Sequence, residues 1–472
     1  MLFNSFDFLV FAVLFFSLWP LFRKQDNLRW GFIVFASFIF YGWWDWRFLF
    51  LILFSGLVDY FAGLGLRKKK FNKKMILGVS LGANLGALFI FKYAVFFATV
   101  IEDLVAKLGY EAHLAESIPE FALILPVGIS FYTFQSLSYT IDIYRGRLEP
   151  TRNVLHFFAY LVMFPQLVAG PIIRAKDFLK QLKSYHIPND LEKWNATKMI
   201  CYGLFQKVVI ADNLSYFIDS AFEGKTPYDG TLFWWTVAIA FSFQIYADFS
   251  GYSLMARGLA KMMGYHFKMN FNHPYLATSI KQFWSKWHIS LSTWFRDYVY
   301  IPLGGSRNGI YMGIIALFIT MMLSGIWHGA NYTFIAWAGL HIIYQLIERY
   351  TKWNKKLKHL PALLTLIIFL QVTVAWVYFR ANDINQGTTI IKKLFSLSSS
   401  DITYLSAYLD QLIYLYLAIV IEMIIRARKN RTPLSTFYSK HRDWVDVAFV
   451  SLSIIMILLF RGEGQQFIYF QF

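Results

Sequence analysis

Apolar runs close to the length of a membrane-spanning helix recur along the whole 472-residue chain. A helix needs about 20 consecutive apolar residues to cross a bilayer. Hydrophobic residues make up 57% of the sequence and charged residues only 15%, whereas soluble domains average about 25% charged residues. The sequence therefore predicts an all-α polytopic membrane protein and excludes an ordinary soluble fold.

The apolar runs predict about 11–12 transmembrane helices. The expected spans are 5–22, 30–44, 48–66, 75–99, 120–141, 199–221, 231–253, 310–327, 332–349, 361–379, 404–424 and 444–460. A further apolar segment, 154–173, is broken by Pro165, Gly170 and Pro171. Irregular backbone persists at membrane depth only where protein buries it or where it faces water, so this segment is expected to be re-entrant.

The net charge of +17 is concentrated in short gaps between apolar spans. These basic clusters are Arg67–Lys70, Lys73–Lys74, Lys352–Lys358 and Arg426–Arg431. Short basic loops are typical of the cytoplasmic side of membrane helices. We therefore interpret the charge as a determinant of topology close to anionic membrane lipids, not as a nucleic-acid site.

Neither an internal repeat nor a linker rich in proline and serine divides the chain. We expect a single integral membrane domain over 1–472, with N-terminal helices in 1–119, a motif-bearing core in 120–385 and C-terminal helices in 386–472. The lone Cys201 excludes an intramolecular disulfide and a cysteine metal site. The spacing of His, Asp and Glu residues matches no metal motif, so no metal is expected.

The segment 254–309 is the longest stretch that is not simply apolar. In a helix, Phe283, Trp287, Leu291 and Trp294 would share one face. This pattern predicts an amphipathic helix at the cytoplasmic interface, with tryptophans at the level of the headgroups. Candidate donor-binding cations are Lys281, Lys286, Arg296 and Arg307. Together they can steer a phosphorylated ligand, although each one alone also fits an ordinary cytoplasmic loop charge.

His328 lies between two long apolar runs, Ile310–Leu323 and Tyr332–Ile347. An imidazole among hydrocarbon is costly unless it is paired or lines a wet passage, which indicates a functional site. The alternative is a histidine that only bonds a neighbouring helix. Burial disfavours the charged ring, so His328 is a candidate general base near pH 7.

Three further residues are candidates for a supporting role beside His328. Trp327 precedes it, and Asn331 can orient the ring, stabilise an oxyanion or cap the helix that begins at Tyr332. Asp248 lies inside an apolar span, where a carboxylate needs a partner. We expect an Arg or Tyr of 283–302 to supply that partner.

Several segments together resemble the membrane-bound O-acyltransferase family, in particular its bacterial alginate O-acetylation branch. The resemblance rests on blocks at 126–134, 164–172, 246–252, 283–298, 301–305, 324–329 and 376–381, in that order. Two of these blocks contain Phe283-Trp-Ser-Lys-Trp-His288 and Ser324-Gly-Ile-Trp-His-Gly329. The resemblance covers roughly residues 120–385, and it supplies most of the argument for His288 as a second catalytic residue.

This resemblance implies helices around a central tunnel, with His328 at the waist where a cytoplasmic donor tunnel meets a cavity open to the other side. It implies transfer of an acetyl group from cytoplasmic acetyl-CoA, with no bound cofactor, for O-acetylation of an extracytoplasmic polysaccharide, alginate first. An extracytoplasmic transferase or hydrolase partner would then place the group on the polysaccharide. The implied location is the bacterial inner membrane.

Several alternatives stay open from the sequence. Peptidoglycan, teichoic acid or cellulose can replace alginate as the acceptor. A transporter or scaffold that moves a glycan or lipid-linked sugar without chemistry also accommodates buried polar residues and broken helices. Within the enzyme class, an acyl-histidine step competes with direct base catalysis.

Overall fold

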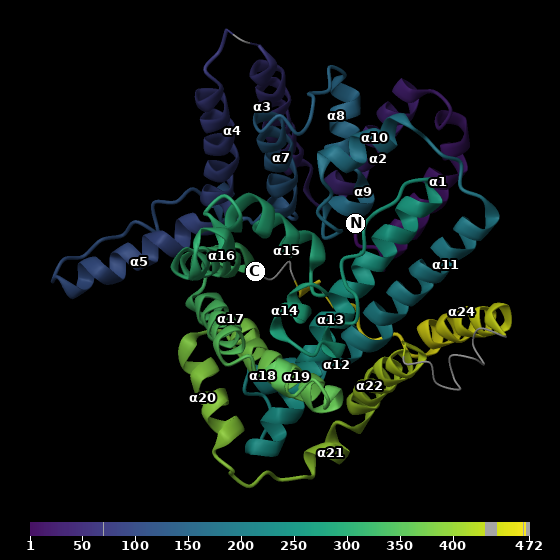
Figure 1. Ribbon diagram of the computed structural model, residues 1–472. Helices are drawn as coiled ribbons and strands as arrows, with labels where there is room; N and C mark the ends of the chain where they lie inside the picture. Colours follow the sequence, from purple (N-terminus) through teal and green to yellow (C-terminus); the bar gives the residue numbers. More distant parts are fainter. Residues whose placement is uncertain (69, 430–440, 466, 469–472) are drawn as a thin grey trace. The chain divides into compact units, whose positions relative to one another are not determined.

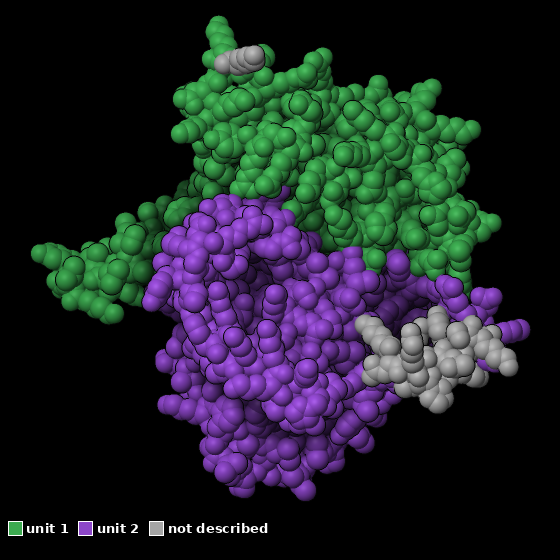
Figure 2. Space-filling model, viewed as in Figure 1, with its two compact units in different colours: residues 1–196, 256–268 green, residues 197–255, 269–472 purple. Residues whose placement is uncertain are grey.

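The computed structural model describes residues 1–68, 70–429, 441–465 and 467–468. The described residues form helices and connecting segments without a strand, which confirms the all-α prediction (Figure 1). Contacts divide them into two compact units, unit 1 with 1–196 and 256–268, and unit 2 with 197–255 and 269–472 (Figure 2). The single domain over 1–472 stays a prediction. The basic cluster expected at Arg426–Arg431 lies partly outside the described residues.

Unit 1 holds the N-terminal helices. They are α1 (Phe6–Phe22), α2 (Asp26–Asp45), α3 (Leu49–Arg67), α4 (Lys73–Leu88), α5 (Ala94–Lys107), α6 (Glu120–Leu123), α7 (Ile129–Tyr144), α8 (Val154–Leu161), α9 (Phe164–Leu167) and α10 (Ala175–Lys183). Two helices, α11 (Asp190–Phe205) and α13 (Thr231–Met262), continue from one unit into the other. The first four expected spans each correspond to helices at nearly the same residues.

A buried carboxylate joins three helices of unit 1. Asp59 of α3 is fully buried, and it accepts hydrogen bonds from Ser80 and Asn84 of α4 and from Ser136 and Thr140 of α7. Such interhelical hydrogen bonds hold apolar helices together where the hydrophobic effect between them is weak. The polar residues inside these apolar runs therefore connect α3, α4 and α7.

The expected break in the segment 154–173 is confirmed. Helix α8 ends at Leu161, α9 has only four residues, and the chain from Val168 to Arg174 is irregular. The backbone N–H of Phe164 donates to the Ser37 hydroxyl at 3.0 Å, and the side-chain amide of Gln166 donates to the Tyr160 carbonyl at 2.7 Å. Protein groups thus supply hydrogen bonds that the broken helix cannot make internally.

Unit 2 contains the remaining helices. They are α12 (Asp212–Phe222), α14 (Ile280–Trp284), α15 (Ile289–Phe295), α16 (Ile310–His328), α17 (Tyr332–Thr351), α18 (Trp353–Lys356), α19 (Pro361–Arg380), α20 (Ile384–Phe395), α21 (Tyr404–Ala407), α22 (Leu409–Lys429) and α24 (Arg442–Leu459). Helix α16 packs against α17, and α17 packs against α19. These three helices form the frame of the candidate site.

Five helical segments of the described chain are long and apolar enough to cross a membrane. They are Asp26–Arg67, Lys73–Lys107, Thr231–Met262, Ile310–His328 and Pro361–Arg380. They support a multi-pass membrane protein, while the larger number of about 11–12 spans stays a prediction. The helix Phe6–Phe22 is apolar but shorter than these five.

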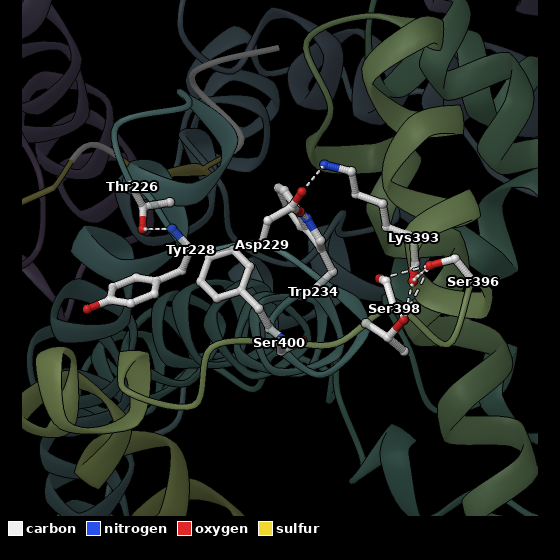
Figure 3. A network of polar contacts seen from close by, with 10 residues as sticks. Thr226, Tyr228, Asp229, Trp234, Lys393, Ser396, Ser398 and Ser400 are labelled. Atoms are coloured by element: carbon white, nitrogen blue, oxygen red, sulfur yellow. Dashed lines mark hydrogen bonds and ion pairs between the residues drawn. The ribbon is translucent and has the colours of Figure 1, made fainter.

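A polar network fixes the beginning of α13 (Figure 3). Asp229 accepts from the Trp234 indole N–H at 2.6 Å and pairs with Lys393 of α20, also at 2.6 Å. The Ser400 hydroxyl accepts from the backbone N–H of Leu232 at 2.9 Å. This hydroxyl caps the first turn of α13, because the first backbone N–H groups of a helix have no partner within it.

A buried ion cluster lies at the middle of α13. The ammonium of Lys207 is 2.8 Å from Asp212 and 2.7 Å from Asp248, and it donates to the Gln465 carbonyl at 3.1 Å. The backbone N–H of Ile468 donates to Asp248 at 2.8 Å. The cluster therefore joins α12, α13 and the segment that follows α24.

We expect Asp248→Ala to lower the free energy of unfolding by about 3–5 kcal/mol, because it removes one carboxylate from a buried ammonium. Thermal unfolding of the detergent-solubilised protein measures the effect. The matched control is Lys225→Ala, which breaks the exposed ion pair with Glu223 and should cost at most about 1 kcal/mol. Equal destabilisation by the two substitutions would contradict the structural role of this cluster.

Candidate active site

His328 is the last residue of α16, and it is 4% exposed in unit 2. Its ring lies 5.1 Å from that of Trp337 on α17 and 5.2 Å from that of Phe379 on α19, both edge-on. The sequence brings these rings together because α16 and α17 are joined by a tight turn and α19 packs on α17. The imidazole is thus held in an aromatic environment.

Two glycines allow α17 to approach the end of α16. A Cβ added to Gly325 would lie 2.6 Å from the Phe334 carbonyl oxygen, and one added to Gly329 would lie 2.1 Å from the Phe334 ring. Any larger residue would therefore displace α17 from the turn that carries His328. These glycines serve close helix packing.

Asn331 is the N-cap of α17. Its side-chain oxygen accepts from the Thr333 backbone N–H at 3.0 Å, and its side-chain amide donates to the Asn382 carbonyl at 2.9 Å. Of the three roles considered for Asn331, the structure contains the helix cap. Through Asn382, the same side chain ties the turn after His328 to the end of α19.

Trp327 lies between the two histidines expected to be catalytic. Its indole ring is 5.0 Å from the His328 ring and 6.1 Å from the His288 ring. Both contacts are edge-on, which aromatic rings favour over a face-to-face sandwich. The structure therefore brings His328, His288 and Trp327 together around one indole.

His288 interrupts the Trp-rich stretch and does not lie within a helix. It is the N-cap of α15 with φ 41°, a left-handed conformation that non-glycine residues rarely adopt. The expected continuous amphipathic helix is therefore wrong: α14 ends at Trp284 and α15 begins at Ile289. Its proposed apolar face is nevertheless buried, since Phe283 and Trp287 are at most 1% exposed.

Asn270 holds this unusual turn in place. Its backbone carbonyl accepts from Ile289 N–H at 2.9 Å, and its side-chain oxygen accepts from the Ser290 backbone N–H at 3.2 Å. The same side-chain oxygen lies 3.2 Å from His288 Nδ1. On the other side of the amide, its nitrogen donates to the Ser253 hydroxyl at 3.2 Å.

These contacts determine the tautomer of His288. A backbone N–H can only donate, so the Asn270 atom that faces Ser290 is the oxygen. His288 Nδ1 must then carry the proton, and Nε2 keeps its lone pair. Burial lowers the pKa of His288 to about 3, so the ring stays neutral at physiological pH. His288 can therefore accept a proton or a hydrogen bond through Nε2.

A cavity of about 820 Å³ lies among α14, α15, α16 and α17. Small-molecule sites typically enclose about 300–1,000 Å³. Its wall on α16 includes Thr320 and Ser324, and Ser324 precedes His328 by one helical turn. His328 itself is not among the lining residues. A waist at His328 with a second cavity on the opposite side stays a prediction.

The cavity wall carries five basic side chains and one acid. The basic residues are Lys281, Arg296, Arg349, Lys352 and Lys355, and the acid is Glu348. Glu348 accepts from the backbone N–H of Ile280 at 2.7 Å, and Arg296 pairs with Asp297 at 2.7 Å. The surplus of positive charge suits an anionic ligand.

The four donor-binding candidates from the sequence divide into two pairs. Lys281 and Arg296 line the cavity, while Lys286 and Arg307 do not. Sequence reasoning missed Arg349 and its basic neighbours because the cluster 352–358 fits an ordinary cytoplasmic loop. One signal could have found them. The cluster 352–358 directly follows the predicted span 332–349, and that span begins just after the turn at His328.

Asp248 lies in the ion cluster with Lys207. The structural role expected for it agrees with this position, but the expected partner from 283–302 is wrong. Lys207 was missed because a lone lysine inside a mostly apolar span has no local sequence partner.

The arrangement provides two buried imidazoles in an aromatic site beside a cationic cavity. In the described part of the chain, no cluster of three or more His, Cys, Asp or Glu side chains could hold a metal ion. Such a site is suited to proton transfer at a group delivered by an anionic carrier.

Comparison with known proteins agrees with this chemistry. The model of the membrane-bound O-acyltransferase family matches residues 148–387. A probable alginate O-acetylase AlgI of Pseudomonas aeruginosa is 40% identical over 79% of this chain and 71% of its own length. The corresponding protein of Pseudomonas putida is 37% identical over 93% of both chains. A peptidoglycan O-acetyltransferase of Helicobacter pylori is 32% identical over 96% of this chain and 92% of its own.

The matched region contains the histidine turn of α15, the cationic cavity and the α16–α17 turn that carries His328. An enzyme is thereby distinguished from a glycan transporter, the other class that the sequence left open. The chain belongs to the membrane-bound O-acyltransferase family, and it is an O-acyltransferase.

Proposed function

We propose that this protein takes an acetyl group from cytoplasmic acetyl-CoA and passes it across the membrane for O-acetylation of an extracytoplasmic polysaccharide. The observation that carries the proposal is the cationic cavity whose wall on α16 ends one turn before His328. The proposed location is the bacterial inner membrane, where the basic loops would face the cytoplasm.

Acetyl-CoA suits the cavity by its charge and length. Its nucleotide carries phosphates, which guanidinium groups such as Arg349 bind with matching geometry. Lys281 and Lys352 would contribute point charges beside them. The pantetheine arm would extend from these charges toward Ser324 and bring the thioester near the end of α16.

His328 would act as the general base. It would take the proton of the attacking hydroxyl, whose oxygen then forms a bond to the thioester carbonyl carbon. The carbon–sulfur bond breaks, and the proton returns from the imidazolium to the sulfur, which leaves an ester and a free thiol. General-base catalysis typically contributes about 10²–10⁴-fold, and the surrounding rings would exclude water from the thioester.

His288 would assist through Nε2. Its Nδ1 is engaged with Asn270 at 3.2 Å, so Nε2 is the nitrogen that we assign to the reaction. Trp327 packs against both imidazoles and would keep them in a fixed relation. We assign His288 a role at the reacting groups and Asn270 a role in positioning His288.

Alginate is the acceptor that we favour, because the relatives named alginate O-acetylases reach 37–40% identity. A partner protein outside the cytoplasm would receive the acetyl group and place it on the polysaccharide. The second candidate is peptidoglycan, favoured by a relative that matches 96% of this chain.

The acceptor can be decided in cells that lack the gene for this chain. We expect the loss of base-labile acetate from alginate, measured on the isolated polymer, with unchanged acetate on peptidoglycan. The opposite distribution would replace alginate by peptidoglycan. Re-expression of the wild-type chain is the control, and it should restore the acetate on the same polymer.

We expect His328→Ala to reduce thioester cleavage by at least about 10²-fold, because it removes the base. Purified protein supplied with radiolabelled acetyl-CoA and with de-O-acetylated alginate as the hydroxyl acceptor provides the measurement, with membrane abundance checked in parallel. The matched control is His359→Ala, which removes an exposed histidine and should leave the rate unchanged. A normal rate with His328→Ala would refute this assignment of the base.

We expect Lys281→Gln to raise the KM for acetyl-CoA about 2- to 5-fold, as is typical for loss of an exposed charge contact. The effect should shrink at high salt, since salt screens exposed charges. Lys286→Gln removes the same charge from a neighbouring residue that does not line the cavity. Indistinguishable KM values for the two variants would contradict the proposal that the cavity binds acetyl-CoA.

A further inference from the structure

One face of α17 connects the cavity with His328. Trp337, His341, Gln345 and Glu348 follow one another at intervals of four, four and three residues, so they lie along one side of the helix. At one end, the Trp337 ring contacts the His328 ring at 5.1 Å. At the other end, Gln345 and Glu348 line the cavity. His341 therefore lies on α17 between the residues that line the cavity and the residue that contacts His328.

His341 is fully buried, with an exposed fraction of 0%. Its ring lies 4.9 Å from that of Trp284 and 5.0 Å from that of Trp337, both edge-on. Phe283 covers it at 6.1 Å in a nearly parallel orientation. Among the residues that the structure describes, neither ring nitrogen of His341 has a hydrogen-bond partner.

Further buried polar atoms without such a partner gather at the same place. They are the indole nitrogens of Trp284 and Trp337 and the side-chain amide nitrogen of Gln345. Trp284 and Gln345 both line the cavity. Buried polar groups in folded proteins are nearly always hydrogen-bonded, so a cluster of exceptions on one route calls for a ligand that supplies the partners.

Three other buried ionisable groups of the interior have hydrogen-bonding or ionic partners. His288 is engaged with Asn270, Lys207 with Asp248, and Asp59 with hydroxyl and amide groups. His341 lacks a comparable partner although it is at least as deeply buried. The environment of His341 is aromatic, and two of the rings that contact it, Trp284 and Trp337, carry indole N–H donors.

We propose that His341 is a positioning residue that hydrogen-bonds an amide of the pantetheine arm as the acetyl thioester passes from the cavity to His328. The arm is an aliphatic chain with two secondary amides, so it can supply hydrogen-bond partners to isolated polar atoms in an aromatic environment. An indole N–H can only donate, to an amide carbonyl, whereas a neutral imidazole can also accept from an amide N–H. This inference rests on the proposed function, since acetyl-CoA supplies the arm.

The experiment compares three donors with the purified full chain, each in the presence of de-O-acetylated alginate as the hydroxyl acceptor. Acetyl-CoA has the nucleotide and the arm, acetyl-pantetheine has only the arm, and S-ethyl thioacetate has neither. We expect His341→Phe, which keeps an aromatic ring, to raise KM about tenfold for the first two donors, as for one lost hydrogen bond. Its kcat should stay within about twofold, and turnover of S-ethyl thioacetate should be unchanged.

Two comparisons separate this role from simple packing. His341→Asn retains a hydrogen-bonding side chain but not the ring, and we expect it to recover part of the KM for acetyl-pantetheine. Lys281→Gln should affect acetyl-CoA but not acetyl-pantetheine, because only the former carries the phosphates. If the His341→Phe variant does not fold, the KM of the His341→Asn variant for acetyl-pantetheine is compared with that of the wild type instead.

Equal KM values for wild type and His341→Phe with both arm-bearing donors would overturn the proposal. His341 would then be a histidine that only packs in the core. A matching loss with S-ethyl thioacetate would also overturn it, because that donor has no amide to hold. If the wild-type chain cleaves none of the three thioesters, the proposed function itself fails. If the wild type cleaves the thioesters and the KM of His341→Phe equals that of the wild type, only the role of His341 is refuted.

Discussion

A polar group inside this protein needs a partner from the protein or from a ligand, and the architecture of unit 2 depends on that constraint. Leaving such a group without a hydrogen bond costs roughly 1–3 kcal/mol. Lys207 meets the constraint with two carboxylates, and His288 meets it with Asn270. Each pairing also fixes the position of a longer segment, so one constraint determines both the packing and the site.

The same constraint explains the state of His288. The Asn270 side-chain oxygen accepts from His288 Nδ1, which leaves Nε2 with its lone pair. The rings of Trp337 and Phe379 pack edge-on against His328. Under the proposed function, this aromatic environment would also exclude water from the thioester.

Most helices could be predicted because their signal is local. A long apolar run such as Ile310–Leu323 has few alternatives to a helix, and prolines indicated the break near Pro165. The turn at His288 could not be predicted, because its left-handed backbone depends on Asn270, eighteen residues earlier in the chain. Periodicity correctly indicated the buried face of the Trp-rich stretch and wrongly joined its two helices.

The donor cavity shows a different limit of sequence reasoning. Lys352 and Lys355 follow the end of α17, where basic residues are expected on topological grounds alone. The structure places them in the same cavity wall as Lys281 and Arg349, so charges expected on topological grounds also face the cavity. Under the proposed function, topology and donor binding would require the same sign of charge on the same side of the membrane. A sequence pattern alone therefore cannot distinguish the two roles, whereas helix packing can, because it decides which of these side chains line the cavity.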